Sequence, residues 1–275
     1  MNRLALTGIP RGGTTLACRL LSHCPNTLAL AEPLSMRALP VPQDAAIAAV
    51  LAAFDAIHHR LLTEGHAPAT VVNGGIVDNF FGEDGEGVRT RRAWAGQVRP
   101  QTVWRHGNLL AIKQNAGFLA LLPELAHRLP VVAIIRHPLP VLASWQTVDL
   151  PVRDGLLPAG EHFDPALRTR LDGVPDAAAR QLIVLDWCFS RIAMLSPERI
   201  VRYESMVASG GESLYRACGV AGTTQPLQDR NASPLYRACD PHQLAARLRN
   251  FGGAWTRFYP AETDAGVLAA LQGGA

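Results

Sequence analysis

The sequence predicts an α/β protein with a parallel sheet flanked by helices, and three features of the chain support this class. Short apolar runs of strand length alternate with longer segments in which apolar residues recur at helical spacing. A glycine-rich turn joins the first run to the first helical segment. The composition is globular, with 48% hydrophobic and 18% charged residues and no repeat that we detect. Strands that alternate with helices form parallel sheets. A chain of 275 residues could be one domain or two, and we expect residues 1–275 to be a single domain.

Four apolar runs are expected to form the strands of this sheet: residues 3–7, 109–113, 131–135 and 199–203. Six segments with helical spacing are expected to be helices: residues 14–23, 45–62, 118–129, 139–148, 177–195 and 241 to about 258. Segments 71–106 and 149–175 show little periodicity, and we interpret them as insertions made mainly of loops. Ligands of such a sheet bind beyond the carboxyl ends of the strands.

The charged residues give a net charge of +3, from 26 arginines and lysines against 23 acidic residues. They are spread along the chain without a basic block, which does not indicate a nucleic-acid partner. All but one of the cations are arginine, and Lys113 is the single lysine. Lys113 is therefore a candidate for chemistry that arginine cannot perform, although a compositional bias could also have spared it by chance.

Cysteine usage and the N-terminal residues bear on the compartment. The five cysteines are odd in number and lack CxxC or paired Cys/His spacing, so we expect reduced structural thiols. No uninterrupted apolar run reaches about 18 residues, and the N-terminus passes directly into a strand pattern without a small-residue cleavage site. We expect a cytoplasmic protein with no membrane partner. The oligomeric state stays open.

The glycine-rich turn, GIPRGGTT at residues 8–15, fits the spacing G-x-x-x-x-G-x-T. This is the Walker A pattern with Thr14 in the place of the lysine. Backbone N–H groups of such a turn, together with the dipole of the helix that follows, form a cradle for a phosphate or sulfate ester. The residues expected to contact the anion are Arg11, Gly12, Gly13, Thr14 and Thr15. The alternative is a structural turn between strand and helix.

A second phosphate-site feature separates this chain from kinases. A P-loop kinase needs the Walker lysine and a Mg²⁺ held partly by an aspartate after a second apolar strand. Here the apolar run VVAII is followed by Arg136, which offers a cation where a metal would need an anion. No histidine has metal-ligand spacing. The sequence therefore predicts an arginine-rich anion site without a metal.

Four motifs in order resemble the sulfotransferases that use 3′-phosphoadenosine 5′-phosphosulfate (PAPS). Residues 9–34, IPRGGTTLACRLLSHCPNTLALAEPL, resemble their 5′-phosphosulfate loop, which typically reads P-[RK]-S-G-T-T; Gly12 replaces the serine. In IIRHPLPVLASW, Arg136 and Ser144 keep the eight-residue spacing of the 3′-phosphate motif. LAIKQNAGFLALLPELAHRLP and IVRYESMVAS also follow the family's order.

The resemblance implies the sulfotransferase fold, a P-loop-like parallel sheet flanked by helices, and a function. The family moves a sulfuryl group from PAPS to a hydroxyl without a metal, as 3′,5′-ADP leaves. Segments 71–106 and 149–175 match no family motif and are expected to form the pocket of the acceptor, a small molecule or peptide that the sequence does not identify. The alternatives are a P-loop small-molecule kinase and a catalytically inactive nucleotide-binding scaffold.

The resemblance also implies roles for individual residues. Arg11 would stabilise the leaving 5′-phosphate, and Lys113 would reach the sulfuryl oxygens. Glu32, 21 residues after Arg11, resembles the catalytic glutamate of protein-tyrosine and some bacterial sulfotransferases, while Asn115 stands where the cytosolic animal-type enzymes have a histidine. We expect burial and nearby anions to raise the basicity of Glu32, unless it caps a helix or is ion-paired. Tyr203 resembles a residue near the 3′-phosphate, or is a core tyrosine.

Overall fold

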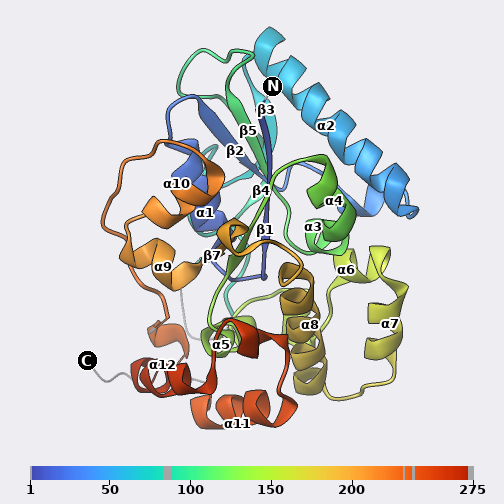
Figure 1. The fold of residues 1–275 in the computed structure, drawn as a ribbon, viewed down its shortest axis with the longest axis vertical. Coiled ribbons are helices and arrows are strands. Elements are labelled where there is room, and N and C mark those ends of the chain that lie inside the picture. Colours follow the sequence, from blue (N-terminus) through green and yellow to red (C-terminus); the bar gives the residue numbers. More distant parts are fainter. Residues whose placement is uncertain (1, 83–87, 232, 237–238, 272–275) are drawn as a thin grey trace.

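The computed structural model describes residues 2–82, 88–231, 233–236 and 239–271, and its centre is a five-stranded parallel sheet (Figure 1). The strand order is β2-β5-β1-β6-β7. The strands are β1 (Asn2–Gly8), β2 (Thr27–Ala31), β5 (Leu109–Lys113), β6 (Val131–Ile135) and β7 (Ile200–Arg202). The predicted α/β class with a parallel sheet is confirmed.

Both faces of the sheet are buried, because alternate residues of each strand point to opposite sides. Leu4 and Leu6 of β1 belong to one apolar core and Ala5 to the other. The first core is covered by α1 (Thr14–Ser22), α9 (Tyr203–Ala208) and α10 (Glu212–Cys218). Strands buried on both sides have continuous apolar runs such as VVAII. Such runs lack the alternation of a half-buried strand, so only their short length identifies them as strands.

The other face is covered by more helices, which Figure 1 shows on the opposite side of the sheet. They are α2 (Gln43–Thr63), α3 (Ala116–Ala120), α4 (Leu122–Arg128), α5 (Pro138–Gln146) and α8 (Ala177–Ile192). The helices α11 (Pro241–Phe251) and α12 (Asp264–Leu271) both pack on α5. The C-terminal part of the chain thus lies against the helix that follows β6.

Within the described ranges, α2 is the one helix long and apolar enough, by length and composition, to cross a membrane. One side of this helix, which includes Val50, Phe54 and Leu61, is buried in the core. The five cysteine thiols are free, as the sequence predicts.

The predicted insertion 71–106 contains regular structure that the sequence did not reveal. Its β4 (Trp94–Val98) pairs antiparallel with β3 (Ala67–Val71), which begins just before the insertion. Residues 83–87 lie outside the described residues. Between the two strands, residues 78–81 line the cleft described below.

The expectation that 149–175 is mainly loop was wrong. This segment forms the 3-10 helix η2 (Pro151–Asp154) and the helices α6 (Pro158–Phe163) and α7 (Pro165–Asp172). Each begins with proline, whose missing N–H and fixed φ suit the first helical position. Asp164 caps α7 by accepting from the N–H groups of Ala166 and Leu167. Helices of one or two turns are too short for apolar spacing to reveal.

Other boundaries differ in detail. The expected helix 118–129 is two helices, α3 and α4, that meet at Leu121. The expected helix 241–258 ends at Gly252, where φ is 62°, and a short 3-10 helix follows. The strand β2 was not predicted at all, because TLALA is short and precedes a proline-rich stretch.

Candidate functional site

A cleft of about 640 Å³ lies at the carboxyl ends of the strands. Its walls come from the loop after β1, from the residues that end or follow β2, β5 and β6, and from the distant segments 78–81, 225–230 and 233–236. Of the residues predicted for the site, those that line the cleft are Arg11, Gly13, Thr14, Thr15, Glu32, Lys113, Arg136 and Tyr203. Gly12 and Ser144 are buried and are not among the residues that line the cleft.

The loop after β1 needs its glycines for close packing. At Gly8, with φ at 150°, a Cβ would lie 2.2 Å from the carbonyl oxygen of Ile134. At Gly13, with φ at 95°, a Cβ would lie 2.6 Å from the ring of Tyr203. Arg11, between them, has a φ of 67°, which is unusual for a residue with a side chain. Such left-handed residues are frequent at binding sites, where the surroundings stabilise them.

The same loop presents unpaired N–H groups to the cleft. In the described part of the chain, the backbone N–H groups of Gly13, Thr14, Thr15 and Leu16 have no hydrogen-bond acceptor. They lie at the first turn of α1, where the dipole of the helix adds partial positive charge. This geometry suits an anion with several oxygen atoms.

Arg11 adds a cation to this cradle. Its Nε donates to Ser144 Oγ at 3.2 Å, and both terminal nitrogens lie 3.3 Å from Asn79 Oδ1. Burial, followed by repulsion from the guanidinium groups of Arg89 and Arg136, lowers the pKa of Arg11 to about 9. The side chain is therefore still charged at neutral pH. Among the described residues, no carboxylate forms an ion pair with Arg11.

Arg136 is a second cation of the cleft, on the same side as Arg11, and is 4% exposed. Its Nε donates to Asn231 Oδ1 at 2.7 Å, and its terminal nitrogens donate to the carbonyl oxygens of Arg230 and Arg11 at 2.7 and 3.2 Å. The guanidinium lies over the ring of Tyr203, 4.6 Å from its centre. No ion pair joins Arg136 to a carboxylate in the described ranges. Burial lowers the pKa of Arg136, but Tyr236, Tyr203 and Glu204 outweigh it and the net direction is upward, so the guanidinium stays charged and can take an anionic ligand as a direct partner.

Ser144 and Tyr236 lie beside the two arginines. Ser144 is fully buried, and its hydroxyl accepts from Arg11 and not from Arg136. Burial raises the pKa of the Tyr236 phenol, but the charge of Arg136, a hydrogen bond with Ser144 and the charge of Arg11 outweigh it and the net direction is downward. Positive charge and hydrogen bonding beside Tyr236 thus both contribute to this shift. Sequence analysis did not identify Tyr236.

Lys113 and Glu32 form an ion pair in the cleft. Both follow from the parallel pairing of β2 and β5, because Ala31 lies opposite Lys113 and the N–H of Glu32 donates to the Lys113 carbonyl at 2.9 Å. Lys113 Nζ lies 2.5 Å from Glu32 Oε1, and Arg91 Nη2 lies 3.5 Å from Glu32 Oε2. Lys113 is 1% exposed, whereas Glu32 is open to the cleft. The structure thus brings these two predicted site residues into direct contact.

Glu32 follows the ion-paired alternative, and its pKa is lowered, not raised as burial and nearby anions would predict. Burial raises the pKa of this carboxyl, but the charge and hydrogen bond of Lys113 and the charge of Arg91 outweigh burial, so the net direction is downward. Glu32 also has a φ of 49°, a second left-handed residue in the site. The sequence could not reveal the lysine contact, since the two residues are 81 positions apart.

Segment 78–81, with the sequence DNFF, contacts several of the charged groups that line the cleft. Asn79 accepts from Arg11, and the ring of Phe81 lies 4.8 Å from the Arg11 guanidinium carbon. The ring of Phe80 lies 5.3 Å from Lys113 Nζ, and Asp78 Oδ2 is 3.7 Å from both Arg19 and Arg230. Two adjacent aromatic residues in a polar insertion were the only sequence feature that could have indicated a role for this segment. The sequence does not show which groups they contact.

The position of the animal-type histidine is also informative. Asn115 lines the cleft, and its buried Oδ1 has no hydrogen-bond partner among the described residues. Within the described positions, no group of three or more histidine, cysteine, aspartate or glutamate side chains could hold a metal ion. Tyr203, the other predicted contact, accepts from the N–H of Arg230 at 2.9 Å and packs against Gly13.

Comparison with known proteins adds no family to this description. No family model matches the sequence, and no curated protein is significantly similar to it. The chain is therefore characterised by its fold, an α/β arrangement with a five-stranded parallel sheet, and by the cationic cleft at the carboxyl edge of that sheet.

Proposed function

We propose that this protein is a sulfotransferase that moves a sulfuryl group from PAPS to a hydroxyl acceptor. The observation that supports this most is the pair Arg11 and Arg136: two guanidinium groups in one cleft, each held by neutral groups and neither paired with a carboxylate of the described residues. Together with the open N–H groups of the loop after β1, they favour a ligand with two separate anionic groups. PAPS carries a 5′-phosphosulfate and a 3′-phosphate.

The residues present fit such a substrate. The N–H groups of Gly13, Thr14 and Thr15 would bind the 5′-phosphate, as helix N-termini bind phosphates in general. Arg136 would bind the 3′-phosphate from the end of β6. The finer fold assignment, a P-loop-like sulfotransferase fold, is part of this proposal. It is compatible with the parallel sheet and with a glycine-rich loop between β1 and α1.

Lys113, Arg11 and Glu32 would carry out the transfer. The hydroxyl oxygen of the acceptor attacks sulfur while the bond from sulfur to the 5′-phosphate oxygen breaks, and the hydroxyl proton passes to the Glu32 carboxylate. Arg11 stabilises the charge that develops on the leaving phosphate, and Lys113 stabilises the sulfuryl oxygens. A Lys113 ammonium that turns toward the sulfuryl group would leave Glu32 with less positive charge nearby. The pKa of Glu32 would then rise at the step in which a base is needed.

Isothermal titration calorimetry tests the proposal before any acceptor is known. Binding of 3′,5′-ADP should be stronger than binding of 5′-AMP by about one to two orders of magnitude, since charge-assisted hydrogen bonds are worth roughly 1.5–3 kcal/mol each. ATP with Mg²⁺ is the comparison ligand for a kinase. Equal affinity for 3′,5′-ADP and 5′-AMP, or preferential binding of ATP with Mg²⁺, would contradict the proposal.

A further inference from the structure

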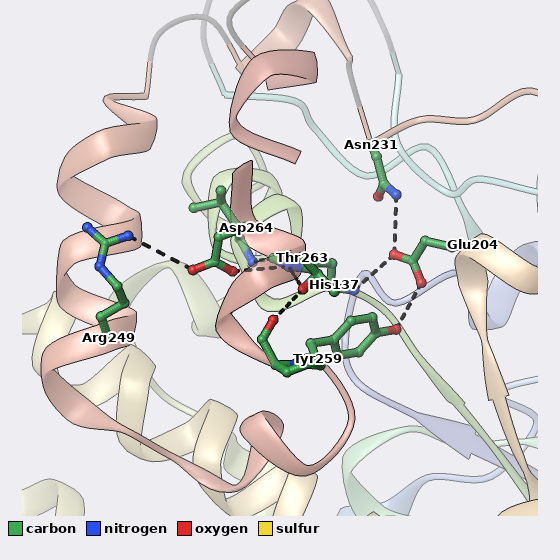
Figure 2. Close-up of polar contacts among 9 residues, drawn as sticks. His137, Glu204, Asn231, Arg249, Tyr259, Thr263 and Asp264 are labelled. Carbon is green, nitrogen blue, oxygen red and sulfur yellow. Dashed lines mark hydrogen bonds and ion pairs between the residues drawn. The ribbon is translucent and has the colours of Figure 1, made fainter. Parts of the chain in front are cut away.

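The group that fixes Arg136 is a neutral amide, although a carboxylate lies just behind it. Asn231 Oδ1 accepts from Arg136 Nε at 2.7 Å. Asn231 Nδ2 donates to Glu204 Oε1 at 3.2 Å (Figure 2). An amide has one acceptor and two donors on the same planar group. Because a carboxylate can only accept, Glu204 determines which way the amide faces. The carbonyl oxygen of Asn231 must then point toward the guanidinium.

Glu204 is itself held from two other directions. Its Oε1 accepts from the backbone N–H of His137 at 3.0 Å, and its Oε2 accepts from the Tyr259 hydroxyl at 2.8 Å. Burial and the nearby charge of Glu204 raise the pKa of Tyr259, so this phenol stays protonated and donates. His137 follows Arg136 directly in the chain. Glu204 therefore fixes the backbone beside Arg136 as well as the side chain that accepts from it.

The same cluster reaches the C-terminal helices. His137 Nε2 lies 3.2 Å from Thr263 Oγ1 and 3.3 Å from Asp264 Oδ1, at the start of α12, and Arg249 of α11 lies 4.0 Å from Asp264 (Figure 2). Glu204 and His137 thus connect the end of β6 to a part of the chain that the motifs do not include. The chain after residue 209 contributes to the anion site through these contacts.

We infer that Glu204 is a positioning residue for Arg136, acting through Asn231, and that the amide keeps the guanidinium available to an anionic ligand; the identity of that ligand rests on the proposed function. A direct pair between Arg136 and a carboxylate would place a negative charge where the ligand anion binds. An asparagine between them provides orientation without neutralising the cation. Preorganisation of this kind raises affinity because the free protein has already paid the cost of ordering.

Two measurements on the full-length protein test the inference. The first needs no ligand: the Nε–H signal of Arg136 in a ¹⁵N NMR spectrum, identified by its loss in Arg136→Ala. A hydrogen bond to a fixed acceptor slows exchange of this proton with water. Glu204→Gln and Asn231→Ala should each speed the exchange by about fivefold or more, because local opening then costs less. Unchanged exchange in both variants would overturn the inference.

The second measurement is the ratio of affinities for 3′,5′-ADP and 5′-AMP. Glu204→Gln should reduce the ratio by about five- to twentyfold and leave 5′-AMP binding within about twofold, since a single oriented hydrogen bond to a charged group is lost. In an Arg136→Ala background the same change should have no further effect on the ratio. A proportional loss for both nucleotides, matching a lower folded fraction, would mean that Glu204 is only structural.

Two further variants keep the outcomes distinct. Tyr259→Phe removes one hydrogen bond from Glu204 and keeps the ring, so it should show a smaller change of the same kind even if Glu204→Gln folds poorly. The matched control is Glu212→Gln, an exposed glutamate paired with Arg216 at 2.8 Å, which should change neither measurement. If the wild-type protein does not distinguish the nucleotides but the NMR result holds, the proposed function fails and the positioning role stands. If the nucleotides are distinguished and Glu204→Gln changes nothing, the inference fails alone.

Discussion

The cleft has two halves, one around Arg11 and Arg136 and the other around Lys113 and Glu32, and their positive charges have different partners. Arg11 and Arg136 are held by amide, hydroxyl and carbonyl oxygens, and no carboxylate pairs with either in the described ranges. Lys113, in contrast, is closed into a 2.5 Å pair with Glu32. The first arrangement keeps a permanent charge available for a bound anion. The second balances a charge that can change, because the carboxyl group can take up a proton.

The comparison predicts its largest effect at Glu32. Glu32→Gln should bind 3′,5′-ADP as the wild type does and lose roughly 10²- to 10⁴-fold in turnover, as expected when a general base is removed. The measurement is sulfate transfer from PAPS to a hydroxyl acceptor. Glu64→Gln, at an exposed glutamate paired with Arg60 at 2.8 Å, is the control. Turnover that falls only in step with the folded fraction would make Glu32 a structural partner of Lys113.

A smaller but selective effect is expected in the other half of the cleft. Arg136→Ala should lower the affinity for 3′,5′-ADP by about 10- to 150-fold, the equivalent of one or two charge-assisted hydrogen bonds, and leave 5′-AMP binding nearly unchanged. Calorimetry with both nucleotides measures this. Equal losses for the two ligands would show that Arg136 supports the cleft instead of reading the 3′-phosphate.

The paired half should also affect stability with pH. Lys113 and Arg91 hold the folded-state pKa of Glu32 below its usual value, so the pair stabilises the fold above the unfolded-state pKa of about 4.3. This stabilisation is lost as the pH falls through the lower folded-state value. Urea unfolding of wild type and Glu32→Gln should therefore differ most near pH 7 and converge toward pH 3.

A constant difference between the two proteins at every pH would mean that the stability effect of the substitution is unrelated to ionisation. Because Glu32→Gln also leaves Lys113 buried without its counter-charge, the variant should be the less stable protein at neutral pH.

The smallest expected effect is that of chelation. With arginine and lysine in the roles that Mg²⁺ has in kinases, EDTA should leave transfer activity and 3′,5′-ADP affinity unchanged. Activity that disappears on chelation and returns with Mg²⁺ would support the kinase alternative.

Much of the site could be predicted because its parts are contiguous in the chain. The glycine-rich loop with Arg11, Thr14 and Thr15 is one stretch of sequence, and its conformation follows from local backbone geometry. Arg136 and Lys113 each directly follow or end an apolar strand, and the ends of parallel strands meet at one edge of the sheet. These positions were therefore expected at the cleft. The short helices of 149–175 and the strand β4 were not predicted, because their weak local signals do not distinguish them from loops.

The sequence alone determined the class of fold, the anion loop and which cations end the strands, because periodicity and adjacent residues encode them. Only the tertiary structure decided what surrounds those cations. Asn79, Asn231 and Glu32 reach Arg11, Arg136 and Lys113 from 68, 95 and 81 residues away. Such contacts are set by how the loops pack at the sheet edge, and no local pattern records them. The direction of the Glu32 pKa depends on one of these contacts, so sequence reasoning could not choose between the expected rise and the ion-paired alternative.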